Sequence, residues 1–147
     1  MSTATPSLFG RITAVEDDHG ALLAMLGRLR AHHVSLLLDP PETDSSLAPL
    51  VEELKIRLVA HFAAEENDNY FGSLVTQNPF LRDPVEELRS DHRRIERAVT
   101  DLQDAVWRGG AARLLATHLG NLLERLQDHE RRESIVVREF LSGNAAE

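Results

Sequence analysis

The stretch HFAAEE, residues 61–66, is the most informative in the sequence because it continues an apolar helical stripe with two titratable side chains, His61 and Glu65. Leu54 and Leu58 precede it at helical spacing, and His61 and Glu65 continue the same face. Residues four apart on a helix lie one turn apart on the same side. The spacing therefore directs an imidazole and a carboxylate toward the interior of the protein.

The bulk composition limits the classes of function. A chain of 147 residues suits one domain with a sizeable core. The formal charge of -8, without a basic run, disfavours a nucleic-acid or anionic-membrane partner. The absence of cysteine excludes disulfides, zinc-thiolate sites and Fe–S clusters, so a metal would be held by histidine and carboxylate. No signal peptide or spanning segment is visible, and the expected location is cytoplasmic.

Four segments carry apolar residues at helical spacing, and no strand pattern is visible. Asp83 followed by Pro84 predicts the start of the third, with Asp83 as the capping residue. Short connections make consecutive helices neighbours, which predicts an all-α, up-down-up-down antiparallel four-helix bundle as a single domain over 1–147. The expected helices span about residues 11–38, 47–75, 84–108 and 111–141.

The inward stripes of all four expected helices carry imidazoles or carboxylates. Counted from the connecting loops at the rise of an α-helix, these side chains fall within roughly 9 Å of one another along the bundle axis. They therefore form one layer across the bundle. Its members are His19, His61, Glu65, His92, His129 and Glu133.

A layer of this composition indicates a metal centre. Buried carboxylates and imidazoles without partners each cost several kcal/mol or more, and a multivalent cation would offset that cost. Mutual hydrogen bonding that fixes the helix register is the structural alternative. Imidazole with carboxylate suits iron, manganese or zinc. Four histidines and two glutamates suit two metals, each with two terminal imidazoles, with the glutamates as bridges and water, hydroxide or oxide in the remaining positions.

The chain resembles the hemerythrin-like, or HHE cation-binding, domain over nearly its whole length. The resemblance is carried by a lone histidine on the first helix, HFAAEE on the second, DHRRIE on the third and HERRE on the fourth. It implies a non-haem di-iron centre that binds or reacts with oxygen, nitric oxide or peroxide. It also implies that His19, His61, His92 and His129 are terminal iron ligands and that Glu65 and Glu133 bridge.

Two positions depart from the oxygen-carrying hemerythrins. Those proteins have HxxxH on the third helix and end with histidine and aspartate five residues apart, whereas this chain has His92 with Glu96 and His129 with Glu133. One imidazole is therefore missing, so that either both irons are open or Glu96 fills the gap. The departure disfavours reversible oxygen carriage and favours redox cycling, peroxide or nitric oxide chemistry, or sensing.

Several alternatives stay open at this stage. The centre could serve a metal- or redox-responsive regulatory module, with an electron-donor or regulatory protein as partner, or it could be a purely structural site, for example for zinc. A ferritin-like di-iron bundle is disfavoured because histidines outnumber glutamates in the layer. The second ring nitrogen of each metal-bound imidazole needs an acceptor, for which Glu16 and Asp18 are candidates.

Five further residues near the motifs have weaker predictions. Glu66 and Glu130 point about 100° away from the motif and are predicted to be surface residues. Tyr70 is expected to be a packed aromatic near the bundle end. His33 and His118 share a height of their own, which indicates either a polar end layer or a second, weak metal site.

Overall fold

The computed structural model describes residues 8–38 and 47–145, without the side chains of residues 9, 16–18, 68, 69, 144 and 145. The candidate acceptors Glu16 and Asp18 therefore lie outside the described side chains. The described residues contain helices and no strand, which confirms the all-α class. The long helices are α1 (Leu8–Leu38), α2 (Leu47–Glu66), α4 (Arg82–Trp107) and α5 (Ala112–Ala145).

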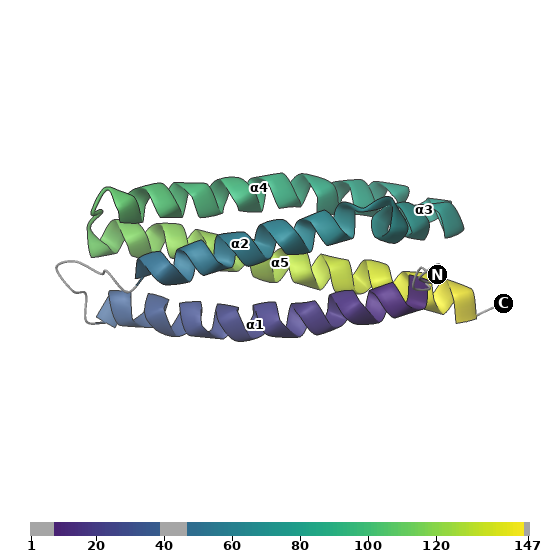
Figure 1. Ribbon diagram of the computed structural model, residues 1–147, viewed down its shortest axis with the longest axis horizontal. Helices are drawn as coiled ribbons and strands as arrows, with labels where there is room; N and C mark the ends of the chain where they lie inside the picture. The colour runs from purple at the N-terminus through teal and green to yellow at the C-terminus, as the bar shows by residue number, and fades with distance from the viewer. Residues whose placement is uncertain (1–7, 39–46, 146–147) are drawn as a thin grey trace, which may run out of the picture.

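The four long helices lie side by side in a bundle (Figure 1). Helix α1 contacts α2 and α5, and α4 contacts the same two helices, so that each long helix packs against two others. Helix α1 begins and α5 ends at the same end of the bundle (Figure 1). None of the described helices is both long enough and apolar enough to cross a bilayer.

Two separate apolar clusters fill the interior. The larger consists of the buried apolar residues of 22–36 in α1, 47–62 in α2, 95–105 in α4 and 115–126 in α5. The smaller consists of those in 12–15, 70–74, 81–88 and 136–140. Five of the six His and Glu side chains of the predicted layer fall between these ranges, and His61 lies beside Phe62 at the end of the α2 range. The polar layer therefore divides the apolar core in two.

The second expected helix is interrupted just after Glu65. Helix α2 ends at Glu66, a π-helical turn follows over Asp68–Gly72, and the short α3 spans Ser73–Gln77. The run Asn-Asp-Asn at 67–69 and the glycine at 72 have low helix propensity, which weakens a regular α-helix there. The wider turn allows the adjacent Tyr70 and Phe71 both to be buried in the smaller cluster.

The capping prediction at Asp83 was wrong. Helix α4 begins at Arg82, one residue earlier, directly after a 3-10 turn at Pro79–Leu81. The side chain of Asn78 accepts a hydrogen bond from the backbone N–H of Phe80 and so caps this preceding turn. Asp83 lies instead in the first turn of α4, where its charge is favourable to the helix dipole.

The connection from α4 to α5 requires a glycine. Gly109 has φ = 67°, the left-handed region that other residues adopt at a cost. Its N–H donates to the carbonyl of Val106, and that of Gly110 donates to the carbonyl of Ala105. These bonds satisfy the last carbonyls of α4 and end the helix.

Candidate metal centre

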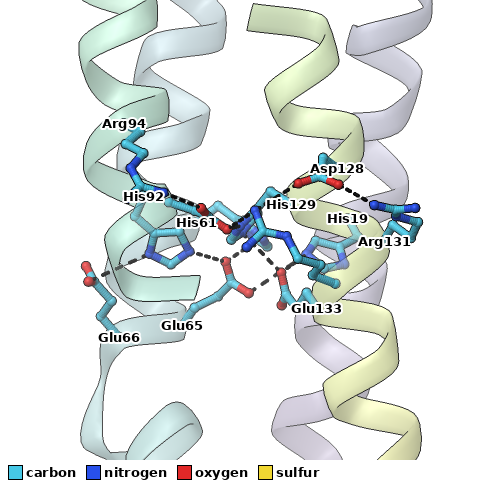
Figure 2. A network of polar contacts seen from close by, with 12 residues as sticks. His19, His61, Glu65, Glu66, His92, Arg94, Asp128, His129, Arg131 and Glu133 are labelled. Carbon is cyan, nitrogen blue, oxygen red and sulfur yellow. Dashed lines mark hydrogen bonds and ion pairs between the residues drawn. The ribbon is translucent and has the colours of Figure 1, made fainter. Parts of the chain in front are cut away.

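The carboxylate of Glu65 lies at the middle of the polar layer (Figure 2). Its Oε1 is 3.1 Å from Nε2 of His61 on the same helix and 3.3 Å from Nε2 of His92 on α4. Its Oε2 is 4.0 Å from Nε2 of His19 on α1. One carboxylate therefore faces three imidazoles from three helices.

Glu133 of α5 faces the imidazoles that complete the layer. Its Oε2 is 3.3 Å from Nε2 of His19 and 3.6 Å from Nε2 of His129. The structure thus brings all six predicted side chains to one place, through contacts that link the four long helices.

The donor atoms form two overlapping groups, within each of which all atoms lie within 4.8 Å of one another. The first contains His19, His61, Glu65 and Glu133, and the second contains Glu65, His92 and His129. The histidines therefore pair as His19 with His61 and as His92 with His129, whose ring centroids are 4.5 Å and 4.9 Å apart. Glu65 belongs to both groups, as a bridging carboxylate would.

The layer is buried, and hydrogen bonds do not satisfy all of it. Glu65, Glu133, His92, His61 and His129 are each at most 3% exposed. Both ring nitrogens of His92, Nε2 of His129 and both carboxylate oxygens of Glu133 lack a hydrogen bond of good geometry. Unsatisfied buried polar atoms are costly. A cation between them would turn these facing donors into ligands, so the residues fit a metal.

The electrostatic environment favours the metal-binding forms of His92, His129 and Glu133. Burial and the neighbouring His129 lower the pKa of His92 from 6.5 to about 3, and burial also lowers the pKa of His129. Burial opposes the charged form of Glu133, but its interactions with Glu65 and His19 lower its pKa. Neutral imidazoles and an ionised carboxylate are the forms that coordinate a metal.

Two aromatic rings cover the His92/His129 pair. The ring of Phe62 stacks on that of His92, with centroids 3.9 Å apart and planes 10° apart, and meets His129 edge-on at 5.7 Å. Phe71, placed by the π-helical turn, lies 5.7 Å from His92 on a nearly parallel plane. These contacts fix the His92 ring and exclude water from its side of the layer.

Asp91, which was not predicted from the sequence, contacts the layer from outside. It is 5% exposed, and its Oδ2 lies 3.3 Å from Nδ1 of His129. The same carboxylate forms ion pairs with Arg132 and, at 3.6 Å, with Arg94. An aspartate directly before a predicted ligand was the only sequence signal, and it did not specify which helix the side chain would reach.

The structure places Glu96 outside the layer. Its side chain is exposed on α4, where it borders a small surface hollow with Lys55 and Thr100. It belongs to neither donor group. The suggestion that Glu96 replaces the missing imidazole is therefore not supported by its position.

Glu66 and Glu130 are less exposed than predicted. The side chain of Glu66 is 33% exposed, with Oε1 3.7 Å from Nδ1 of His92 (Figure 2). Glu130 is half-buried, and burial raises its pKa, opposed in part by the charge of His19. Both carboxylates therefore flank the imidazoles of the layer. Neither is a fully solvated surface residue.

The predictions away from the layer have clear outcomes. Tyr70 is 2% exposed within the smaller apolar cluster, which confirms the packed aromatic. His33 packs closely against Gly120, where a Cβ atom would lie 3.1 Å from Nε2 of His33. His118 instead lines a surface cavity that Arg94 also lines. Neither histidine belongs to a converging donor group among the described residues.

Comparison with known proteins identifies the family. The family model of the hemerythrin HHE cation-binding domain matches residues 11–138, which include all six residues of the layer. No curated protein and no solved structure matched the chain in the corresponding searches. Because the match covers most of the sequence, the chain belongs to the hemerythrin HHE cation-binding domain family.

Proposed function

We propose that this protein binds two iron ions at the polar layer and binds or reacts with a small ligand there, namely oxygen, nitric oxide or peroxide. His19 and His61 would hold one ion, His92 and His129 would hold the other, and Glu65 would bridge. Glu133 would bind the ion held by His19 and His61. Its Oε2 also faces His129, so Glu133 would form a second bridge to the other ion.

The observation that carries this proposal is the division of six donor side chains, five of them buried, into two groups that share Glu65. A single ion would have little use for six protein donors. Two ions use all of them, and each then has fewer protein donors than a six-coordinate ion requires. The family match supports a cation at this layer.

A pair of iron ions would supply redox-active centres with coordination positions for a small exogenous ligand. The residues of the chain would orient and shield these positions. Glu65 and Glu133 offset the cationic charge in a buried site, and Phe62 and Phe71 exclude water beside His92. This arrangement suits a small uncharged ligand better than a large or strongly hydrated substrate.

The proposal includes the antiparallel up-down-up-down connection of a single domain. The colours of Figure 1 run in opposite directions along neighbouring long helices, which supports this connection. The breadth of the family match, residues 11–138, supports one domain.

Metal analysis and absorption spectra of protein purified from iron-supplemented cells test the proposal. We expect about two irons per chain and near-ultraviolet bands of a bridged ferric pair that change on addition of azide or on reduction. Protein that neither contains iron nor binds it anaerobically on titration would contradict the proposal. Zinc as the only bound metal, without spectral change, would instead support a structural site.

A further inference from the structure

Asp91 has a position that differs from those of the other carboxylates around the layer. It comes from α4, directly before His92, but its Oδ2 lies 3.3 Å from Nδ1 of His129 on α5. The contact is buried, with Asp91 5% and His129 2% exposed. A buried carboxylate on one helix thus meets the outer nitrogen of an imidazole on the next.

The two nitrogens of His129 face different groups. Nδ1 faces Asp91, whereas Nε2 faces the oxygen of Glu133 at 3.6 Å, inside the layer. A neutral imidazole carries one N–H, and an ionised carboxylate can only accept a hydrogen bond. Both facing carboxylates are acceptors, but the contact with Asp91 is within hydrogen-bond distance and the contact with Glu133 is not. The proton of His129 is therefore favoured on Nδ1, which leaves the lone pair of Nε2 directed at the layer.

Arginines hold Asp91 in this place. Arg132 of α5 contacts Oδ2 of Asp91 and also contacts Asp128 at 3.0 Å, while Arg94 lies 3.6 Å from Oδ1. Guanidinium groups on both sides balance the buried negative charge and restrict the rotation of the carboxylate. Asp91 is thereby fixed as an acceptor for His129.

The partner of His92 is different. Among the described side chains, Nδ1 of His92 faces the carboxylate of Glu66 at 3.7 Å, which is beyond hydrogen-bond distance, and that side chain is 33% exposed. His92 and His129 belong to the same donor group. Among the described residues, a buried carboxylate lies within hydrogen-bond distance of the outer nitrogen of His129 but not of that of His92.

We propose that Asp91 is the positioning residue of His129, which it holds as the Nδ1–H tautomer so that Nε2 is available to a metal. Metal binding by the His92/His129 group then depends on Asp91, whereas binding by the His19/His61 group does not. The part that concerns metal affinity rests on the proposed function, and the part that concerns the tautomer does not.

The tautomer can be read in metal-free protein with ¹⁵N-labelled histidine by NMR at about pH 8, where an ordinary imidazole is neutral. We expect the Nδ1–H form of His129 in the wild type and a shift toward the Nε2–H form in Asp91→Ala. Asp91→Asn, which keeps an acceptor oxygen without the charge, should shift the population less. The control Glu66→Gln should leave the tautomer of His129 unchanged. An unchanged tautomer in both Asp91 variants would overturn the proposal.

Titration with Co²⁺ under anaerobic conditions separates the two metal positions. Asp91→Ala should weaken one of the two binding steps about 10- to 100-fold, as is usual for a carboxylate that supports a metal-bound imidazole, and leave the other within about threefold. Asp91→Asn should give a smaller loss, and Glu66→Gln should stay within about threefold of the wild type at both steps. Equal weakening of both steps, or of neither, would overturn the proposal.

The two measurements also separate this inference from the proposed function. Wild-type protein that binds no metal would contradict the proposed function, and the NMR measurement would still decide the role of Asp91. Conversely, two bound metals with an unchanged tautomer in the Asp91 variants would retain the function and reject the positioning role. Circular dichroism on each variant identifies any that does not fold, and the isosteric Asp91→Asn then carries the test.

Discussion

The His92/His129 pair and the His19/His61 pair differ in what surrounds them. His92 and His129 are each at most 2% exposed, and Phe62 and Phe71 lie against this pair. In the His19/His61 pair, the side chain of His19 is 16% exposed. Asp91 of α4 faces the outer nitrogen of His129, and Glu66 of α2 faces that of His92 from a greater distance.

The difference indicates two kinds of metal position in one layer. Stacking fixes the ring of His92 and an outer carboxylate fixes that of His129 before a metal arrives, which favours tight binding and a defined geometry. A partly exposed ring leaves a shorter path to solvent. We therefore expect the His92/His129 position to hold its ion more tightly and the His19/His61 position to exchange more readily.

The largest expected effect comes from Glu65, which both groups share. Glu65→Gln should abolish the binding of both metals. Glu133→Gln should weaken both positions, and the His19/His61 position more, because Glu133 belongs to that donor group. In wild-type protein, free metal at 100 times Kd should raise the free energy of unfolding by about 2.7 kcal/mol, and Glu65→Gln should show no such gain. Metal analysis measures the number of bound ions, and thermal unfolding with and without metal measures the gain in stability. Retention of two metals by Glu65→Gln would contradict the shared role.

The pH dependence of metal-free protein comes next in size. The pKa of His92 is about 3 in the folded state and 6.5 without the influence of the fold, because burial and His129 disfavour the charged ring. The unfolded chain therefore binds a proton at a pH where folded His92 does not. The free energy of unfolding should fall by about 1.4 kcal/mol per pH unit through this histidine as pH decreases below 6.5 toward 3.

Urea unfolding between pH 8 and pH 5 measures this dependence. The comparison with His92→Leu isolates the contribution of the histidine, because carboxylates elsewhere titrate in both proteins. The variant should show a shallower slope. Identical slopes would contradict the assignment to His92.

Replacement of His92 by leucine should also change the free energy of unfolding at pH 8, by a smaller amount. The variant should be more stable than the wild type although it binds metal less well. The two nitrogens of His92 lack hydrogen bonds of good geometry, and leucine fills similar space without polar atoms. Removal of an unsatisfied buried polar group should stabilise metal-free protein by about 1 kcal/mol. Metal binding at the His92/His129 position should be lost. A clear loss of stability without metal would indicate that His92 serves the fold.

The smallest expected effect concerns Glu96. Its exposed position on α4 predicts that Glu96→Gln leaves the metal count and the absorption bands unchanged and the free energy of unfolding within about 0.5 kcal/mol of the wild type. Loss of a metal from this variant would show that Glu96 rotates inward on loading. In that case the comparison between the two pairs would need a seventh ligand.

The composition and height of the layer were predictable because they depend on regular features. Helical spacing sets which residues face inward, and short connections set how far along each helix the layer lies. The position of Glu65 follows from both rules, since it continues the stripe of Leu54 and Leu58. The match of the family model agrees with the resemblance that these motifs carried.

Other features depend on how the helices approach one another, which spacing does not specify. Asp91 reaches His129 across the gap between α4 and α5, so no pattern within α4 identifies it. The pairing of His92 with His129 likewise depends on which helices are adjacent. The π-helical turn after Glu66 arises from residues that are merely poor helix formers, and tertiary packing of Tyr70 and Phe71 selects its form.

The layer has a consequence for a chain without cysteine. Ions held by His19 and Glu133 would cross-link segments that lie near opposite ends of the sequence. A covalent bridge that closes a loop of about 100 residues restricts the unfolded ensemble by about 4.7 kcal/mol in the chain-entropy estimate. Bound ions would thus cross-link the chain as disulfides do in other proteins. Unlike a disulfide, this cross-link could be removed by a chelator.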